Sequence, residues 1–508
     1  MKILPRFLLP LFVALLLFCA KTSRAQVAET PLSVPSAETP APLPPPPPPE
    51  SEIPPPLAGW HGGLFYLRDE HDNFRLYFQG RSQIDVYSYF GPGVPDTKLK
   101  ATLFLRRVRP ELSGEVLGHW QWMFAGDFVG AAAPVDNPNG APGDAQTVGI
   151  RAQATDVFLN YRADRMLNLQ VGQYDAPFMM ENRTSDKYTP FMERAFAARS
   201  FGIPSNKELG AMLWGETADR LLFYSVGVFN GEGQNRPNFD GQAEVMGRVF
   251  THPIGSGPVK DFQIGGSFRY TGKNSYYVYY NVPNMTTQGN FTFWKSTYGT
   301  TRILPSGIQE AFAGELRLPI DWFDITGELV YVKNNTREAL DGQEARFTER
   351  KGDLHGIAYY AQLGFWPLGN RDINGQPGYE NPAHVDFKKK NPETPAQSLQ
   401  LLIKWEQLMA TYSSASRTNS ANPNTDGDIK MNALSLGANY WATKHVRLTL
   451  NYVFNMFPDS TPGTGPYQGS PAQRAIAPAQ TLRTGVNDDA RANAHVSHEL
   501  LGRMAVAF

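Results

Sequence analysis

Apolar and polar side chains alternate along residues 74–90, FRLYFQGRSQIDVYSYF. One parity carries apolar or small residues: Phe74, Leu76, Phe78, Gly80, Ser82, Ile84, Val86 and Phe90. The other parity is largely polar: Arg75, Tyr77, Gln79, Arg81, Gln83, Asp85 and Tyr87. A period of two predicts a β-strand with two different faces. In a soluble sheet the apolar face would meet a core, whereas in a membrane barrel it would meet lipid.

The same alternation recurs in pairs that predict hairpins: residues 157–171 with a turn at 163–165, 316–331 with a tight connection, and 434–454 with a turn at 442–444. Longer segments rich in Gly, Pro, Asn and Asp lie between the hairpins, at roughly 91–100, 130–150, 175–206, 230–242, 271–307, 333–353, 411–429 and 457–493. Short turns and long loops therefore alternate, and they separate about sixteen strands, an even number typical of closed outer-membrane barrels. Residues 367–396 are the exception, because they are long where a short turn is expected.

Aromatic side chains flank the short turns: Trp120, Trp122, Tyr161, Trp322, Phe323, Tyr440 and Trp441. Cross-strand pairs in a soluble sandwich would explain one or two of these, but repeated placement at strand ends is typical of a membrane interface. The final residues ELLGRMAVAF alternate as well, and Phe508 shares the apolar parity. We therefore predict an all-β fold, a transmembrane antiparallel β-barrel of sixteen strands with short periplasmic turns and long extracellular loops. The apolar face of 74–90 would point to lipid and its polar face into a wet lumen.

The N-terminus has the features of a secretory signal peptide. Lys2 and Arg6 precede an apolar run, and Ser23 and Ala25 are small residues at the positions that a cut after residue 25 requires. The apolar run is shorter than the ~18–20 residues of a transmembrane helix. A lipoprotein signal ending at Cys19 is an alternative, although the bulky Phe18 precedes it.

Three segments follow from these patterns: a signal peptide at 1–25, a Pro-rich spacer at 26–58 and a barrel domain at 59–508. Proline dominates residues 31–57, so the spacer should be an extended polyproline II segment. A partner-binding Pro-rich arm is the alternative interpretation. We expect export to the bacterial outer membrane.

Composition and motifs argue against several function classes. The 47 basic and 48 acidic residues give a net charge of -1, so no basic surplus favours a nucleic-acid partner. Patterns typical of serine hydrolases, zinc proteases, P-loops and dinucleotide sites are missing from the sequence. His495 and His498 have opposite strand parity, and residues 422–428 lack the later bidentate Glu of a calcium loop. We expect no enzyme activity, no cofactor and no metal site.

Several stretches resemble the phosphate-selective porins O and P, from about residue 72 to the end of the chain. They are FQGRSQIDVYSYF, LFLRRVRPELSGEVLGHWQWMFAGDF, VFLNYRADRMLNLQVGQYDAPFMMENRTSDKYTPFMERAF, YSVGVFNGEG and LGANYWATKHVRLTLNYVF. The resemblance implies a sixteen-stranded outer-membrane barrel that assembles as a homotrimer. It also implies loops that fold inward and narrow an anion pathway.

The resemblance also nominates anion-binding residues. LRRVRPEL resembles the family's double-arginine strand at the constriction, QGRSQID its first lumen arginine, and APFMMENRTSDKYTPFMERAF its inward third loop. The candidates are Arg81, Arg106, Arg107, Arg109, Arg183, Lys187 and Arg194. Residues 367–396, with Lys388, Lys389 and Lys390, resemble an inward-folding periplasmic segment. Arginine suits an anion path because its planar fork donates several hydrogen bonds and stays charged.

One feature departs from the phosphate-specific members of that family. Beyond Arg107 and Arg109 there is no R-x-R-x-R run, and carboxylates share the lumen parity: Asp85, Glu111, Glu115, Asp156, Glu315 and Glu328. In the alternative interpretation, the arginines only pair with wall carboxylates such as Glu111 and balance the charge of the lumen.

The leading hypothesis is a passive porin for small anions, phosphate or polyphosphate among them, in outer-membrane lipid. Its C-terminal strand, ending at Phe508, would be recognised by the barrel-assembly machinery. Alternatives are a non-conducting scaffold with a Pro-rich arm and a general-diffusion porin without anion preference. A barrel-embedded hydrolase is disfavoured because no nucleophile–base pair can be identified.

Overall fold

The computed structural model describes residues 56–90, 102–129, 152–274, 282–289, 292–294, 296–298, 301–340, 351–369, 371–374, 378, 382–387, 396–414, 427–457 and 496–508. The predicted signal peptide, nearly all of the predicted spacer and Lys388 to Lys390 lie outside these ranges. Pro55–Phe508 form one compact unit. Within the described ranges, no helix has the length and apolar character needed to cross a membrane.

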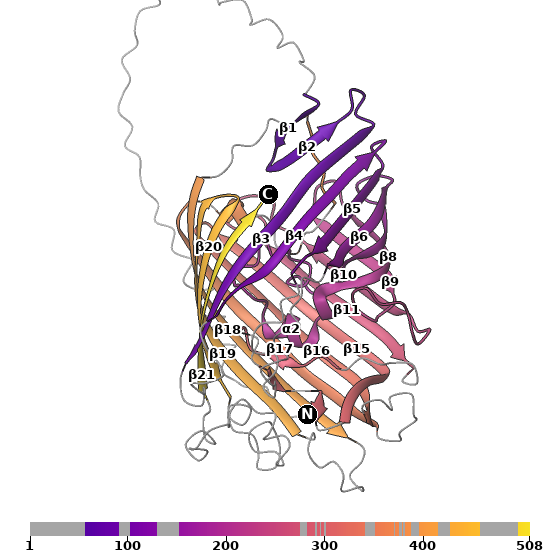
Figure 1. Cartoon of the computed structure of the whole chain (residues 1–508), viewed down its shortest axis with the longest axis vertical. Helices are drawn as coiled ribbons and strands as arrows, with labels where there is room; N and C mark the ends of the chain where they lie inside the picture. Colours follow the sequence, from indigo (N-terminus) through magenta and orange to yellow (C-terminus); the bar gives the residue numbers. More distant parts are fainter. Residues whose placement is uncertain are drawn as a thin grey trace, which may run out of the picture. The chain divides into compact units, whose positions relative to one another are not determined.

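Nineteen strands share one sheet, and all but the short β1, β2 and β14 (Thr297–Tyr298) form a closed antiparallel ring (Figure 1). The ring consists of β3 (Phe74–Phe90), β4 (Thr102–Val116), β5 (Trp120–Asp127), β6 (Gln153–Arg162), β7 (Asn168–Asp175), β8 (Lys207–Glu216), β9 (Leu222–Phe229), β10 (Glu244–Thr251), β11 (Gln263–Lys273), β15 (Thr301–Ile320), β16 (Phe323–Leu340), β17 (Lys351–Leu368), β18 (Ala396–Ser414), β19 (Gly427–Thr443), β20 (Val446–Met456) and β21 (Val496–Ala507). Each strand pairs with its neighbour along the chain, and β21 pairs with β3 to close the cylinder. The predicted sixteen-stranded barrel is confirmed.

Side-chain exposure on the wall is the reverse of that in a soluble sheet. On β3 the apolar Phe78 and Val86 are each 42% exposed, whereas the polar-parity residues Asp85 and Tyr87 are fully buried. Apolar residues of other strands are exposed in the same way, including Leu103, Phe124, Leu159, Val228, Phe312 and Leu450. A wall of this kind is stable where lipid covers the apolar face. The apolar face of 74–90 points outward, as its alternation indicates.

The three predicted hairpins form, with turns between β6 and β7, β15 and β16, and β19 and β20. Three predicted loops are shorter than expected. β16 continues to Leu340 and β17 begins at Lys351, while β11 continues to Lys273 and β15 begins at Thr301. β18 continues to Ser414 and β19 begins at Gly427. The added strand residues, such as Asn334, Asn335 and Thr336, are polar on both parities. Strand ends that extend past the lipid have no apolar face, so alternation does not reveal them.

A short N-terminal hairpin, β1 (Ala58–His61) and β2 (Leu64–Arg68), adjoins the seam of the barrel (Figure 1). β21 ends where the backbones of Phe508 and Gly80 exchange hydrogen bonds of 2.8 and 3.0 Å. From Phe78 to Arg75, β2 takes over the same edge of β3. β21 and β2 thus lie end to end along the same edge of β3.

Candidate functional site

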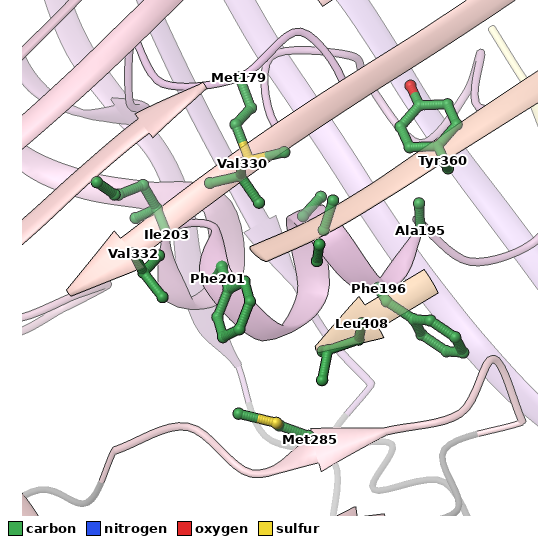
Figure 2. Close-up of a cluster of buried hydrophobic side chains, with 14 of the residues drawn as sticks. Met179, Ala195, Phe196, Phe201, Ile203, Met285, Val330, Val332, Tyr360 and Leu408 are labelled. Atoms are coloured by element: carbon green, nitrogen blue, oxygen red, sulfur yellow. The ribbon is translucent and has the colours of Figure 1, made fainter. Parts of the chain in front are cut away.

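The lumen is narrowed by residues 176–206, which connect β7 to β8 at the long-loop end and are largely buried inside the barrel. They include the short helix α2 (Phe196–Phe201), which contacts β16, β17 and β18. Figure 2 shows the apolar cluster that joins this loop to the wall. Its labelled members are Met179, Ala195, Phe196, Phe201, Ile203, Met285, Val330, Val332, Tyr360 and Leu408. Burial of these side chains at ~25 cal/mol per Å² fixes the loop to one side of the lumen.

Wall carboxylates hold the backbone of this inward loop. Glu328 accepts hydrogen bonds from the N–H groups of Met180 (2.5 Å) and Glu181 (3.0 Å). Glu406 accepts one from the N–H of Phe196 (2.9 Å). A carboxylate that accepts buried N–H groups removes the cost of leaving irregular backbone unpaired. The loop is therefore anchored by both apolar packing and charge-assisted hydrogen bonds.

A second segment, residues 282–289, also enters the lumen. The Gln288 amide donates to Glu406 (2.7 Å) and to Ser435 (2.8 Å), and the Gly289 N–H donates to Glu499 (2.8 Å). The two inward segments leave a cavity against the wall formed by β3 to β6 and the start of β8.

A β-bulge in β4 turns two consecutive arginines toward the lumen. Gln83 pairs with Arg107 and Ile84 pairs with Leu105, so Arg106 is an extra residue without a partner in the ladder. A bulge of this type breaks the strict alternation of side chains. Arg106 and Arg107 therefore both face the cavity, while Leu105 remains 50% exposed on the outer wall.

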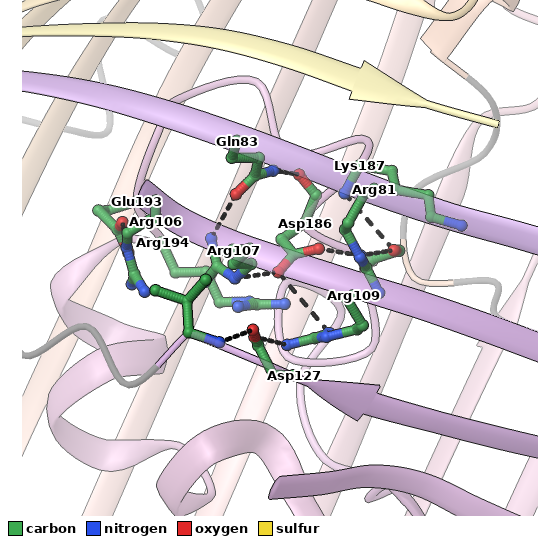
Figure 3. A network of polar contacts seen from close by, with 12 residues as sticks. Arg81, Gln83, Arg106, Arg107, Arg109, Asp127, Asp186, Lys187, Glu193 and Arg194 are labelled. Carbon is green, nitrogen blue, oxygen red and sulfur yellow. Dashed lines mark hydrogen bonds and ion pairs between the residues drawn. The ribbon is translucent and has the colours of Figure 1, made fainter. Parts of the chain in front are cut away.

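Three guanidinium groups converge on Asp186 of the inward loop (Figure 3). Arg107 Nε lies 2.6 Å from its carboxylate, Arg109 lies 4.0 Å away, and Arg81 forms an ion pair with it as well. Arg81 also pairs with Glu111 of β4 at 2.7 Å. Asp186 thus supplies the negative charge at the point where these arginines meet.

A second carboxylate of the loop, Glu193, is surrounded by cations. Arg106 lies 3.1 Å from it, and Arg503 of β21 lies 3.3 Å from it and 2.7 Å from Asp85. Burial raises the pKa of Glu193, but the charges of Arg106, Arg107 and Arg503 outweigh burial and hold that pKa well below its ordinary value. Glu193 is consequently ionised at neutral pH and ties the loop to two strands.

The cavity between loop and wall has a volume of ≈ 450 Å³. Among the described residues, seven cationic side chains line it: Arg81, Arg106, Arg107, Arg109, Arg194, Arg199 and Lys207. Four described acidic side chains line it as well: Asp127, Asp175, Asp186 and Glu193. The described part of the lining therefore carries an excess of three positive charges.

Some donor capacity in this cavity is not used by protein groups. Arg194 donates to the backbone carbonyls of Glu181 (2.9 Å) and Thr184 (2.7 Å). Arg199 donates to the carbonyl of Thr286 (3.0 Å), and its Nη1 is buried without a hydrogen-bond partner among the described residues. Arg109 Nε is also buried and has no hydrogen-bond partner among the described residues. Such N–H groups are available to an anion that enters the cavity.

The structure brings most of the sequence-predicted cations together. Arg81, Arg106, Arg107, Arg109 and Arg194 line the cavity, and Lys187 lines an adjoining one. Arg183 does not line either cavity, because it turns back and donates to the carbonyl of Asp175.

Sequence reasoning missed Arg199 and Lys207. Arg199 lies on α2, where no strand parity applies, and Lys207 lies between Asp156 (2.6 Å) and Asp175 (2.8 Å) at the start of β8. The sequence does not reveal that Lys207 pairs with two carboxylates, because Asp156 and Asp175 are far from it along the chain.

The six carboxylates predicted to share the lumen all lie inside it and are buried. Their contacts are Asp85 with Arg503 (2.7 Å), Glu111 with Arg81 (2.7 Å) and Lys187 (2.6 Å), Glu115 with Tyr77 (2.7 Å) and His384 (2.9 Å), Asp156 with Lys207 (2.6 Å), Glu315 with Arg248 (2.7 Å), and Glu328 with the loop backbone. Within the described residues, no group of three or more His, Cys, Asp or Glu is arranged to hold a metal ion. The carboxylates mainly fasten strands and inward segments to one another.

Comparison with solved structures gives similar barrels at low sequence identity. OmpT of Vibrio cholerae is 10% identical with a TM-score of 0.47, and the match covers 87% of this chain and 100% of that chain. The outer-membrane channel DcaP of Acinetobacter baumannii is 10% identical with a TM-score of 0.46, and the match covers 87% of this chain and 99% of that chain. An anion-selective porin from Comamonas acidovorans is 12% identical with a TM-score of 0.44, and the match covers 86% of this chain and 100% of that chain.

No curated protein sequence matches the chain. Residues 76–274 match the family described as phosphate-selective porin O and P. This stretch contains the double-arginine strand, the inward loop and the start of β8. The chain therefore combines a closed sixteen-stranded antiparallel barrel with a stretch, residues 76–274, that is similar to the phosphate-selective porin O and P family.

Proposed function

We propose that the protein is a passive porin through which small anions, phosphate included, cross the outer membrane down their concentration gradient. The observation that carries the proposal is the positive excess of the cavity between the inward loop and β3 to β6. Guanidinium groups in a narrow, partly dehydrated passage concentrate anions and repel cations. The chain would act as a homotrimer, with its short turns toward the periplasm, after a signal peptide at 1–25 is removed.

The double variant Arg106→Gln and Arg107→Gln tests the proposal. A lost charge about 5 Å from a passing anion removes ~3 kcal/mol of attraction at an effective dielectric constant near 20. Screening by water and counter-ions reduces this to about 1 kcal/mol, enough to change anion preference several-fold. We expect the reversal potential of purified protein in a planar bilayer, under a salt gradient, to shift toward cation preference.

The matched control is Arg220→Gln, because the Arg220 side chain is 68% exposed and lines neither cavity. This variant should leave the reversal potential unchanged. A cation-selective wild type would contradict the anion pathway.

A general-diffusion porin without anion preference is the second candidate. It is favoured by the pairing of Arg106 with Glu193 and of Arg107 with Asp186, which cancels much of the field locally. The same measurement separates the two, since this candidate predicts a wild-type reversal potential near zero and no effect of the double variant.

A further inference from the structure

A second cavity, of ≈ 80 Å³, lies at the short-turn end of the lumen. Its polar lining residues are Gln79, Arg81, Gln83, Lys187, Tyr188, Lys444, His445 and Arg447. Among the described residues that line it, none is Asp or Glu. Arg81 also lines the larger arginine cavity, so the two cavities adjoin at this residue.

Arg447, at the start of β20, is a buried cation that forms no ion pair with any carboxylate of the described residues. It is 4% exposed, and its Nη1 donates to the carbonyl of Thr189 at 3.1 Å. Its guanidinium lies 5.7 Å from the ring of Trp441. Its Nε is buried and has no hydrogen-bond partner, and none of the described carboxylates forms an ion pair with it. A buried charge in this condition is unfavourable unless a counter-charge or a further hydrogen-bond acceptor compensates it.

Lys444 adds a second cation from the turn between β19 and β20. It donates to the carbonyl of Gly62 at 3.2 Å, and burial lowers its pKa. The other two cations already have carboxylate partners. Arg81 pairs with Glu111 and Asp186, and Lys187 pairs with Glu111. The excess positive charge of this cavity therefore comes from Lys444 and Arg447.

The size of the cavity restricts what can enter. A site for one water needs ~10–15 Å³ of the same measure, so ≈ 80 Å³ accommodates a few waters or one small oxyanion, but not a sugar-sized solute. Amide groups of Gln79 and Gln83 also line it and supply neutral donors.

We propose that Arg447 and Lys444 form a second anion site, which takes a small inorganic oxyanion on the short-turn side of Arg81. The proposal rests on the proposed function and adds a binding step to it. An anion leaving the arginine cavity passes Arg81 and is then held by Arg447 and Lys444. The donors that no protein group uses are satisfied by the oxyanion.

Block of chloride current by added phosphate tests the second site. Arg447→Gln should raise the half-blocking phosphate concentration about tenfold, equivalent to ~1.4 kcal/mol. The anion preference and the single-channel chloride conductance of this variant should differ from those of the wild type by less than about twofold, because the arginine cavity is intact. Arg447→Lys, which keeps the charge, should recover part of the block.

Arg220→Gln serves again as the exposed control and should leave the block unaltered. An anion-selective wild type whose phosphate block is unchanged in Arg447→Gln would overturn the second site alone. A large conductance change without recovery in Arg447→Lys would also overturn it, and would make Arg447 an anchor for the loop through Thr189. A cation-selective wild type would contradict the proposed function itself.

Discussion

Asp186 carries a negative charge into a point where Arg81, Arg107 and Arg109 converge. Without this carboxylate the three like charges would repel one another, and the inward loop would lose an anchor. With it, the arginines are held in a fixed arrangement that an entering anion shares or displaces. The residue therefore anchors the inward loop and, in the proposed anion pathway, would compete with the solute for the same arginines.

Asp186→Asn separates these two roles. Loss of the carboxylate charge leaves the arginines with one more net positive charge, so we expect a several-fold higher anion preference and a tighter phosphate block. Both are read from bilayer reversal potentials and block titrations. Asp219→Asn, at a turn outside the barrel, is the control, because the Asp219 contacts are confined to its own turn. A fall in anion preference would mean that Asp186 acts mainly by positioning the loop.

Glu193 makes the inward loop sensitive to acid. Its pKa is lower in the folded protein than the ordinary 4.5, so its stabilisation is present above that value and is lost as the pH falls below it. Glu193→Gln should lower the free energy of unfolding at pH 7 by about 3 kcal/mol, because Arg106 and Arg503 lose a partner. The measured gap between wild type and variant, from urea unfolding, should narrow below pH 4.5. A gap that stays constant down to pH 3 would refute this account.

At the scale of elements, two local irregularities shape the pore and the seam. The bulge at Arg106 lets neighbouring arginines reach the same cavity, which a regular strand does not allow. The β1–β2 hairpin covers the edge of β3 beyond Phe508 and leaves those backbone groups paired. On its inner side, Phe387 lies 4.8 Å from Tyr66 and between Arg68 (5.1 Å) and Arg75 (4.9 Å). The hairpin thus joins the seam to the segment 382–387.

Deletion of residues 58–68 should weaken the barrel at its seam. The edge of β3 from Arg75 to Phe78 would lose its partner strand, at a cost on the order of 2 kcal/mol if two net hydrogen bonds are lost. Heat-modifiable electrophoretic mobility should show unfolding at a lower temperature. Deletion of 31–57, the Pro-rich spacer, is the control and should have no effect. Equal heat resistance of both deletions would show that the seam does not need the hairpin.

At the scale of the whole molecule, the near-neutral net charge of -1 coexists with a local excess of cations at one cavity. Positive excess gathers between the inward loop and β3 to β6, while carboxylates on the opposite wall, such as Glu328 and Glu406, bind loop backbone. Outside, apolar residues such as Leu103 and Leu450 form the face that lipid covers.

Strict alternation along the strands determined the class of fold, because side chains of a barrel strand must face lipid and lumen in turn. It also assigned Arg81, Arg107 and Arg109 to one face with Glu111, since parity is a local property. The resemblance to a family of porins added Arg106 and the inward loop.

Tertiary structure alone decided which charges remain unmatched. Asp186 reaches Arg81 across more than a hundred residues, and Arg447 has no carboxylate partner among the described residues although acidic residues are abundant in the sequence. Strand parity places a side chain on a face, but ion pairing depends on which strands and inward segments meet. Arg447 and Lys444 therefore gave no signal in the sequence, because their distinction lies in the absence of a neighbour that only packing of distant segments could supply.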